Sequence, residues 1–428
     1  MTKILIVSHN PLSNSQSNGK TISSILSCFK KTDLAQLYFT LDVPDYDVCE
    51  NFFRITDVDI LKNFLLMNKN VGNIITEKYS LKNKEEKKGY HKNLFYNFIR
   101  KLFVSKISIM TSIRDFVWQN SDFYSKKFEE WIDKFNPDVV FFQSSNCCFA
   151  FEFVLKICKK RGIRVMIETT DDYLSYKKLN LFYNYNVYKL RRCYKELNKY
   201  CDLILPISDD MKEYYQRMFP NNYYTVMNSV TFNNKKNEQD NKIDKFLYAG
   251  NLALGRWKVI YNLAKAVNSI ESNIKIEVYS IDPPSQKIIN KLNEFECCKY
   301  GYSLNKEELT KKIEESDVLL HVESFSKSNR HLTKYSISTK IPELMNSGKK
   351  IFAIGPNDIS SIKYLLKTKT GFVLCTNKNK EIVNGIKEFS KINKFDDYIS
   401  NCKKIVSENH DIKKVQKYIK KFVEDNYE

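Results

Sequence analysis

Short apolar runs rich in valine and isoleucine alternate along the chain with longer stretches in which apolar residues recur at helical spacing. This alternation is typical of parallel strands joined by helices, so we expect an α/β protein. The runs expected to form strands in the first half are 3–8, 138–143, 164–167 and 203–207. Those in the second half are 245–248, 275–279, 318–322, 351–354 and 371–374. The pattern predicts two doubly wound sheets in series.

A polar segment separates the two series. Asn, Lys, Gln and Asp dominate residues 231–244, and their only apolar side chains are Phe232 and Ile243, a composition typical of a solvated linker. We therefore expect an N-terminal domain at 1–230, a linker at 231–244 and a C-terminal domain at 245–405. A final segment, 406–428, contains an amphipathic stretch at 411–423 and should be helical.

The net charge of +19, from 69 Lys and Arg against 50 Asp and Glu, allows several partners. Nucleic acid, an anionic membrane surface and phosphorylated metabolites would all suit a basic chain, but Lys is spread throughout, as a bias of composition would also produce. Eleven cysteines without a CxxC pair fit neither a disulfide framework nor a zinc site, so we expect reduced thiols in a cytoplasmic protein. No run of 18 apolar residues occurs to span a membrane.

Glycine is scarce, and two candidate sites follow strands of the second domain. After strand 245–248, the small-residue loop 249–255 contains Gly250 and Gly255 and delivers Arg256 and Lys258 as a helix begins. The amides of a helix start and two cations suit a phosphate ester, although an ordinary turn with solvated cations is the alternative.

The second candidate site lies before a short predicted helix. Ser338 or Thr339 is expected to cap this helix, Pro342 to lie in its first turn and Gly348 to end it. Glu343, one turn in, could accept hydrogen bonds from vicinal ribose hydroxyls. Both candidate sites follow strands of one sheet, at the edge where open α/β sheets bind ligands. Asn305 and Glu308 predict a capping box on another helix of this domain.

These motifs resemble the donor half of GT-B glycosyltransferases, in particular the retaining family 4 group. The resemblance is carried by Tyr-Ala-Gly-Asn-Leu at 248–252, His-Val-Glu-Ser-Phe at 321–325 and Ser-Thr-Lys-Ile-Pro-Glu at 338–343. The turn at 299–302, with Gly301 and Tyr302, looks like the base-binding turn of that group. The resemblance is strong over about 200–375, and in the rest of the first domain it is weak outside 3–21.

The resemblance implies a GT-B fold, with two Rossmann-like domains facing across a cleft and the 406–428 helix crossing back to the first domain. Glu343 matches the second Glu of the family's E-x7-E motif, which binds ribose. Tyr335 occupies the place of the first Glu, so Glu323 is a candidate for the donor-sugar contact. Gly250-Asn251 replaces the usual Gly-Arg, so Arg256 and Lys258 are candidates for the diphosphate. Lys340, within the third motif, completes the expected donor site.

The first domain contributes the expected catalytic residues. Residues 9–21 resemble the loop that faces the donor phosphates, with His9, Asn18 and Gly19 as its candidates; Gly19-Lys20-Thr21 is not a P-loop, because Asn14 replaces the required glycine. Asp171 and Asp172 follow strand 164–167 and are candidates for positioning the acceptor hydroxyl. The alternative is that both are ordinary acidic residues of a loop.

No group of His, Cys and carboxylate residues has metal-ligand spacing, so we expect a metal-free enzyme without a cofactor, the nucleotide-diphosphate sugar being a co-substrate. His321 is expected in the core, and His331 and His410 at the surface.

The resulting hypothesis is a retaining glycosyltransferase that moves a sugar to a carbohydrate or lipid-linked acceptor, in cell-surface polysaccharide or glycan assembly. A GT-B sugar-nucleotide epimerase is the alternative enzyme, and acceptor-dependent release of nucleotide would discriminate the two. A nucleic-acid-binding protein would explain the charge, but no recognition module is present, so we expect no nucleic-acid partner.

One basic segment bears on where in the cell the protein acts. Residues 78–106 hold nine Lys and Arg against two acids and run into a bulky apolar helical face that includes Leu94, Phe98 and Leu102. The segment predicts either an interfacial helix on the inner face of a membrane or a core-packed helix with a basic flank.

Overall fold

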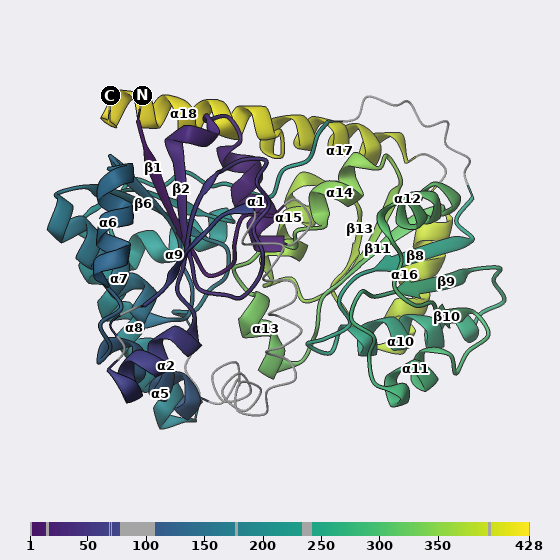
Figure 1. The fold of residues 1–428 in the computed structure, drawn as a ribbon. Helices are drawn as coiled ribbons and strands as arrows, with labels where there is room; N and C mark the ends of the chain where they lie inside the picture. The colour runs from purple at the N-terminus through teal and green to yellow at the C-terminus, as the bar shows by residue number, and fades with distance from the viewer. Residues whose placement is uncertain are drawn as a thin grey trace. The chain divides into compact units, whose positions relative to one another are not determined.

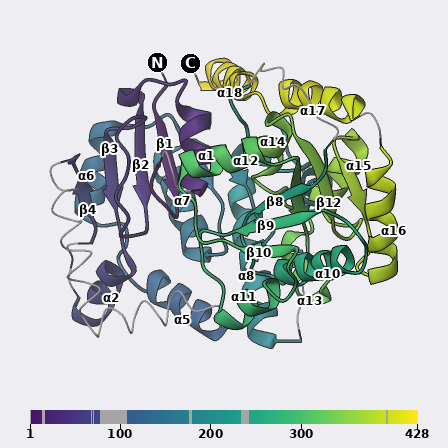
Figure 2. The same cartoon turned by 90° about the vertical axis from the view of Figure 1, so that its right-hand side faces the viewer.

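The computed structural model describes residues 2–13, 17–67, 69, 71–77, 108–175, 179–232, 242–392 and 395–427. The chain forms two compact units: unit 1 is Met1–Val226 with Ile412–Glu428, and unit 2 is Met227–Asp411. Each unit contains one sheet (Figures 1 and 2). The expected domain boundary at 230 differs because Met227 and Val230 pack in a core cluster of unit 2, and the one at 405 differs because Val406 packs in the same cluster. The helix expected within 78–106 and most of the linker lie outside the described residues.

The sheet of unit 1 has seven strands in the order β4-β3-β2-β1-β5-β6-β7. Neighbouring strands are parallel except for β3 and β4. The strands are β1 Ile4–Ser8, β2 Leu34–Tyr38, β3 Asn51–Arg54, β4 Asn73–Ile75, β5 Val139–Gln143, β6 Arg164–Thr169 and β7 Cys201–Pro206. The connection reverses direction between β1 and β5, which makes this pair the switch point of the sheet.

Three strands of unit 1, β2, β3 and β4, are missing from the sequence prediction. They are short, and polar residues interrupt two of them: Gln36 lies in β2 and Arg54 in β3. Gln36 is fully buried, where its amide donates to Ser8 Oγ at 2.8 Å and accepts from the Leu12 amide at 2.9 Å. Buried polar residues of this kind remove the apolar run by which a strand is recognised.

The final helix belongs to unit 1. Helix α18 (Ile412–Tyr427) lies beside α1 (Ser17–Leu26) in both views (Figures 1 and 2). Its residues Val415, Ile419 and Val423 are buried in the core cluster that contains the strands of this sheet. Gln416 Nε2 donates to Ser24 O at 2.7 Å, which fixes the helix along its length.

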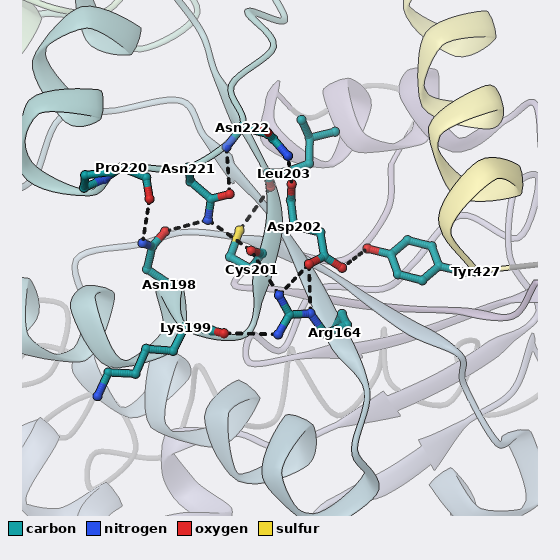
Figure 3. A network of polar contacts seen from close by, with 10 residues as sticks. All are labelled: Arg164, Asn198, Lys199, Cys201, Asp202, Leu203, Pro220, Asn221, Asn222 and Tyr427. Carbon is teal, nitrogen blue, oxygen red and sulfur yellow. Dashed lines mark hydrogen bonds and ion pairs between the residues drawn. The ribbon is translucent and has the colours of Figure 1, made fainter.

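A polar network at the amino ends of β6 and β7 holds the last turn of α18 (Figure 3). Arg164 donates from Nε and Nη2 to Asp202 Oδ1 at 2.8 and 2.5 Å, and the Tyr427 hydroxyl donates to Asp202 Oδ2 at 2.9 Å. This network occupies the edge of the sheet opposite to the carboxyl ends of the strands, so it serves to anchor the helix.

The remaining helices of unit 1 cover the two faces of its sheet. They are α2 Asp57–Leu66, α5 Ser108–Gln119, α6 Lys126–Phe135, α7 Cys148–Arg161, α8 Leu181–Asn198 and α9 Asp209–Met218. Helix α1 begins at Ser17, so Gly19 lies in its first turn and the expected loop 9–21 is helical in its last part. Large aromatic residues fill one side of the core, where Trp118 of α5 stacks on Phe149 of α7 at a centroid distance of 3.9 Å.

The sheet of unit 2 has six parallel strands in the order β10-β9-β8-β11-β12-β13. The strands are β8 Lys245–Ala249, β9 Lys275–Tyr279, β10 Cys298–Tyr300, β11 Val318–Val322, β12 Lys350–Ile354 and β13 Phe372–Leu374. The helices are α10 Arg256–Asn268, α11 Gln286–Leu292, α12 Lys306–Glu315, α13 Lys327–Thr333, α14 Ile341–Asn346, α15 Ser360–Thr368, α16 Asn379–Ser390 and α17 Asp396–Asn409. The order is that of the Rossmann fold, with its switch point between β8 and β11.

Local signals in unit 2 are confirmed in part. The capping box of Asn305 and Glu308 is present at the start of α12. The cap expected for α14 is wrong: Lys340 is its N-cap residue, and no side chain caps the helix.

The expected surface position of His410 is also wrong, because His410 is fully buried. Its ring bonds the Tyr364 hydroxyl at 2.8 Å and Asn228 O at 2.7 Å, and these two partners satisfy both nitrogens in the core.

All eleven cysteines are free thiols. Among the described residues, no helix combines the length and the apolar character that a membrane span requires.

Candidate donor-binding site

The candidate site of unit 2 lies at the carboxyl ends of β8 and β11. These two strands are neighbours at the switch point of the sheet, so the loops that follow them diverge and leave their ends accessible to a ligand. Residues 250–255 follow β8 and lead into α10, and residues 323–326 follow β11 and lead into α13. The two motifs singled out in the sequence, at 248–252 and 321–325, are therefore adjacent in space.

Two glycines let the β8 loop approach its neighbours closely. A Cβ on Gly250 would lie 2.7 Å from the Tyr248 ring and 3.2 Å from Lys340 Nζ. Gly255, the N-cap of α10, has φ 79°, in the left-handed region that glycine adopts without strain. The start of α10 therefore lies close to the loop after β11, where a Cβ on Gly255 would be 3.1 Å from Ser324 Oγ.

The backbone of this loop is already hydrogen-bonded. The amides of Arg256, Trp257 and Lys258 donate to carbonyls of residues 252–255 at 3.1–3.5 Å. The expectation that free amides at this helix start would hold an anion is therefore wrong for these three groups. Positive charge at the site comes instead from side chains.

Arg256 forms an ion pair with Glu323 across the two strand ends. Arg256 Nη2 lies 3.0 Å from Glu323 Oε2 and 3.3 Å from Oε1, and the Glu323 carboxylate is almost completely buried while the guanidinium keeps some exposure. Burial raises the pKa of Glu323, an effect that Arg256 opposes. The guanidinium has further donors beyond those that Glu323 uses, so it can bind a second anion from the exposed side.

His321 lies behind this ion pair and is buried, as the sequence predicts. Its Nε2 is 3.6 Å from Glu323 Oε1. Burial, with the nearby Arg256 and Lys340 charges, lowers the pKa of His321 to about 3, so the ring is neutral at physiological pH. His321 therefore adds no positive charge to the site.

Lys340 supplies a second cation. Its Nζ donates to Ala249 O at the end of β8. Burial, opposed by the Glu343 charge and assisted by the Arg256 charge, lowers the pKa of Lys340 to about 8. A bound anion would favour the charged ammonium and reduce this desolvation penalty. Arg256, Glu323, Lys340 and the Gly250 loop thus form one cluster, here called the switch-point cluster.

The other expected donor residues differ in exposure and in the contacts that they make. Glu343 and Thr339 are exposed at the start of α14, and Ser338 N donates to Ser361 Oγ at 2.9 Å. Asn251 is exposed and accepts from Ala253 N at 2.6 Å. Lys258 is exposed on α10, with Nζ 5.7 Å above the Trp257 ring. The geometry thus brings Glu343 to Lys340, whereas Lys258 lies against Trp257.

The expected base-binding turn follows β10. The Gly301 amide donates to Val278 O at 2.8 Å, and a Cβ there would lie 2.1 Å from the Tyr279 ring. Tyr302 is 78% exposed and meets Tyr300 edge to face at a centroid distance of 6.0 Å. The exposed phenol ring offers a flat surface on which a base could stack.

In unit 1, His9 follows β1 at the switch point of that sheet. Burial and the nearby Arg114 charge lower its pKa to about 4, so its ring is neutral. His9 Nδ1 is buried without a hydrogen-bond partner among the described residues. Gly19 lies close to the loop before it, since a Cβ would be 2.3 Å from Pro11 O. Asn18 lies in α1, and its side chain is outside the described part.

The two aspartates after β6 have different surroundings. Asp172 Oδ1 accepts from the amides of Leu174 and Ser175 at 3.0 and 3.1 Å and from the Tyr215 hydroxyl at 3.2 Å. These bonds make Asp172 a residue that shapes the loop. Asp171 is exposed and accepts from the Tyr173 hydroxyl at 3.2 Å, so of the two it is better placed to meet a ligand.

Two features of unit 1 are absent from the sequence prediction: the ion pair of the buried Arg114 with Asp57, and the buried Glu168. Asp57 Oδ1 accepts from Arg114 Nε and Trp118 Nε1, both at 2.8 Å. Glu168, at the end of β6, accepts from Gln143 Nε2 at 2.8 Å, and burial raises its pKa to about 7. The sequence could have indicated Glu168, because it is a glutamate near the end of an apolar strand. No group of three His, Cys, Asp or Glu side chains suited to a metal ion occurs in the described ranges.

The fold is similar to that of several solved glycosyltransferases. Anabaena HepE, solved in complex with UDP, matches with a TM-score of 0.63 at 12% identity, over 99% of this chain and 100% of that one. Sucrose-phosphate synthase from Thermosynechococcus elongatus matches with a TM-score of 0.60 at 10% identity, over 99% of both chains. A glycosyltransferase from Rickettsia africae matches with a TM-score of 0.59 at 12% identity, over 99% of this chain and 98% of that one.

Neither the models of protein families nor the curated proteins contain a match to this sequence. The likeness in structure extends over the whole chain, through both sheets and the returning helix. The chain therefore has the GT-B fold.

Proposed function

We propose that the protein is a glycosyltransferase that transfers a sugar from a nucleotide-diphosphate sugar to a carbohydrate or lipid-linked acceptor in glycan assembly. The observation that carries this proposal is the switch-point cluster, in which Arg256 and Lys340 lie together at the carboxyl edge of the unit 2 sheet. The GT-B fold supports it, since solved structures with this fold include one in complex with UDP and one in complex with UDP-glucose.

In this proposal each part of the donor has its own contacts. Arg256 and Lys340 bind the diphosphate, Glu343 accepts from the ribose hydroxyls, and Tyr302 with the Gly301 turn contacts the base. Negative charge grows on the diphosphate as the sugar departs, and two cations already in place stabilise that charge without reorganisation. The cations can do the work that a divalent metal does elsewhere, so we propose a metal-independent reaction with retention of configuration.

Unit 1 supplies the acceptor residues in this proposal. His9 is neutral and has an unused ring nitrogen, so it can accept a hydrogen bond from a hydroxyl or hold a proton for it. Asp171 is the exposed carboxylate that can orient an acceptor hydroxyl, whereas Asp172 holds the loop in which Asp171 lies.

The test of the donor site is equilibrium binding by calorimetry, beginning with UDP and UDP-glucose and continuing through other nucleotide sugars. Arg256→Gln should weaken binding of the preferred donor about ten- to a hundredfold, because a charge-assisted hydrogen bond is lost. The matched control is Lys265→Gln, an exposed lysine on the same helix, which should leave binding unchanged. Equal affinities of the Arg256→Gln variant and the wild type would contradict the assignment.

A GT-B epimerase would bind the same donors, so binding alone does not establish transfer. A transferase releases free nucleotide only when an acceptor is present, whereas an epimerase returns an isomeric nucleotide sugar without one. Nucleotide release measured with and without acceptor, alongside chromatography of the nucleotide sugar, distinguishes the two reactions.

A further inference from the structure

Helices α2, α5 and α8 of unit 1 expose large apolar side chains. These are Phe64, Leu65, Leu66 and Met67 at the end of α2, Ile109, Ile113 and Phe116 on α5, and Leu181, Phe182, Tyr185 and Tyr188 on α8, here called the apolar patch. Leu66 is 74% exposed, Met67 84% and Leu181 86%. Soluble proteins rarely expose so many bulky apolar side chains together, and such surfaces usually mark a contact with a partner or a membrane.

The three helices form one continuous surface. Phe64 of α2 meets Phe116 of α5 edge to face at a centroid distance of 6.2 Å. Ser112 of α5 donates to Asn186 of α8 at 2.7 Å, so the exposed residues on either side of this bond adjoin. Helices α2 and α5 lie next to each other in both views (Figures 1 and 2).

The exposed residues are not needed to hold these helices on unit 1. Each helix buries a different face: Ile60 in α2, Trp118 in α5 and Leu190 in α8 lie in the interior. A surface helix normally carries polar residues on the face opposite to its buried one. Here the outer faces of α5 and of the first half of α8 instead carry bulky apolar or aromatic side chains, which favours a contact that withdraws them from water.

The charges around the apolar patch are complementary to an anionic surface. Lys62 and Lys69 flank it on the α2 side, and Arg192 and Lys195 on the α8 side; all four are exposed, and none has an ion pair with a described residue. The single acid of α8, Glu196, is paired with Lys199 at 2.7 Å.

Asp122, an exposed acid, lies beyond the end of α5, and its backbone amide donates to Asn63 Oδ1 at 2.8 Å. The two acids of α2, Asp57 and Asp59, are half-buried and accept hydrogen bonds from Arg114 and from the Thr56 amide. Cations therefore outnumber acids at the rim of the apolar patch. A bilayer with anionic lipid matches both an apolar centre and a basic rim.

We propose that the apolar patch docks on an anionic lipid bilayer, with its bulky side chains inserted at the acyl boundary and the rim cations against lipid phosphates. Tyr185 and Tyr188 are amphipathic and suit the headgroup level. The inference concerns a surface of unit 1 and does not depend on the reaction that the protein catalyses. It also differs from the interfacial role expected for 78–106, which lies outside the described residues.

The test is flotation of the full chain with vesicles of phosphatidylcholine alone and of phosphatidylcholine mixed with phosphatidylglycerol. The wild type should float with the mixed vesicles. The variant Leu66→Ser/Met67→Ser/Leu181→Ser should bind them at least about tenfold less, because burying each such side chain contributes favourably to binding. The control Ile281→Ser/Leu366→Ser changes exposed apolar residues of unit 2 and should float like the wild type.

A second pair of variants tests the basic rim. Lys62→Gln/Arg192→Gln/Lys195→Gln should reduce flotation with mixed vesicles by about tenfold or more, since each cation near anionic lipid contributes about 1 kcal/mol. The control Lys380→Gln/Lys387→Gln/Lys391→Gln removes the same charge from exposed positions of unit 2 and should retain binding. Thermal melting of every variant verifies that the fold is intact.

Each other occupant of the apolar patch gives a different result that would overturn the proposal. If residues 78–106 cover the patch, the wild type will not float and the Ser variant will melt at a lower temperature. If a second copy covers it, sedimentation will show a dimer that the Ser variant loses, without flotation. If 78–106 alone binds lipid, the Ser variant will float as well as the wild type.

Discussion

Replacing Arg256 by methionine should destabilise unit 2, because the change leaves the Glu323 carboxylate buried without its cation. Glu323 is 2% exposed and Arg256 Nη2 lies 3.0 Å from its Oε2. At an effective dielectric constant of about 20, a charge pair at this distance gains roughly 5 kcal/mol, against a desolvation penalty of several kcal/mol for the buried ion. Removing only the cation keeps the penalty, so we expect a loss of about 3–5 kcal/mol at neutral pH.

The destabilisation should shrink as the pH falls. Burial already raises the pKa of Glu323, and Arg256 is the group that opposes this effect, so the methionine variant has a still higher folded-state pKa. A carboxyl whose pKa is higher in the folded state than in the unfolded state adds stability below its unfolded pKa and loses it as the pH rises through the folded pKa.

His321 acts in the same direction on the difference between the two proteins. Arg256 helps to lower its pKa, and without Arg256 the ring takes up a proton more readily at acid pH. Both groups therefore bring the variant closer to the wild type as the pH is lowered.

Native-state hydrogen exchange measures the free energy of opening within unit 2 alone, from the buried amides of β8 and β11. The full cycle comprises Arg256→Met, Glu323→Gln and the double variant. The double variant should recover about 1–3 kcal/mol relative to the sum of the single changes, because neither charge is then left alone. Additive effects, or a loss in the Arg256→Met variant that does not depend on pH, would refute the argument that the buried carboxylate is the cause.

Four further outcomes are expected. Glu343→Gln should weaken donor binding about ten- to a hundredfold, as measured by calorimetry, because a charge-assisted hydrogen bond is lost. The wild-type protein should remain active in EDTA. A loss of activity that Mg²⁺ or Mn²⁺ restores would contradict the metal-independent proposal. Donor affinity should fall as the pH rises through about 8, since Lys340 then loses its proton, and this dependence should disappear in Lys340→Met. His410→Phe should reduce the free energy of unfolding by about 1–3 kcal/mol, measured in urea, because Tyr364 and Asn228 each lose a buried hydrogen-bond partner.

The strands at the centre of each sheet were predictable because both of their faces are buried. Strands β9 and β11 occupy the ranges expected from their apolar runs, and β1, β5, β8 and β12 differ by one residue at one end. A parallel strand covered by helices on both faces reads as a continuous apolar run. Strands β2 and β3 contain Gln36 and Arg54, whose polar groups find partners inside the fold, and a periodicity of apolar residues does not reveal such strands.

The candidate site was predictable as a set of loops but not as a set of contacts. Spacing located Arg256 after one strand and Glu323 after another, and the shared edge of a parallel sheet brought both to the same place. The sequence did not predict that they form an ion pair, because pairing depends on β8 and β11 being neighbours although β9 and β10 lie between them in the chain. The cap of α14 failed for a local reason: the helix begins after Lys340, and Ser338 Oγ accepts from the amide of that N-cap residue at 3.5 Å instead of from an amide inside the helix.

The two switch points carry different charges although the six parallel strands of each sheet follow the same order, with the antiparallel β4 added only in unit 1. In unit 1, Arg114 is buried, held by Asp57 at 2.8 Å and placed 5.0 Å above the Phe149 ring, so its charge is neutralised inside the core. His9, at the end of β1, is neutral.

In unit 2, by contrast, Arg256 shares its charge with Glu323 but remains partly exposed, and Lys340 adds a second positive charge when protonated. An anion therefore gains electrostatic energy at the end of β8, whereas the end of β1 offers a neutral hydrogen-bonding group to an uncharged partner such as a hydroxyl. This difference in charge, rather than the fold that the two sheets have in common, is the physical reason for assigning the donor to unit 2 and the acceptor to unit 1.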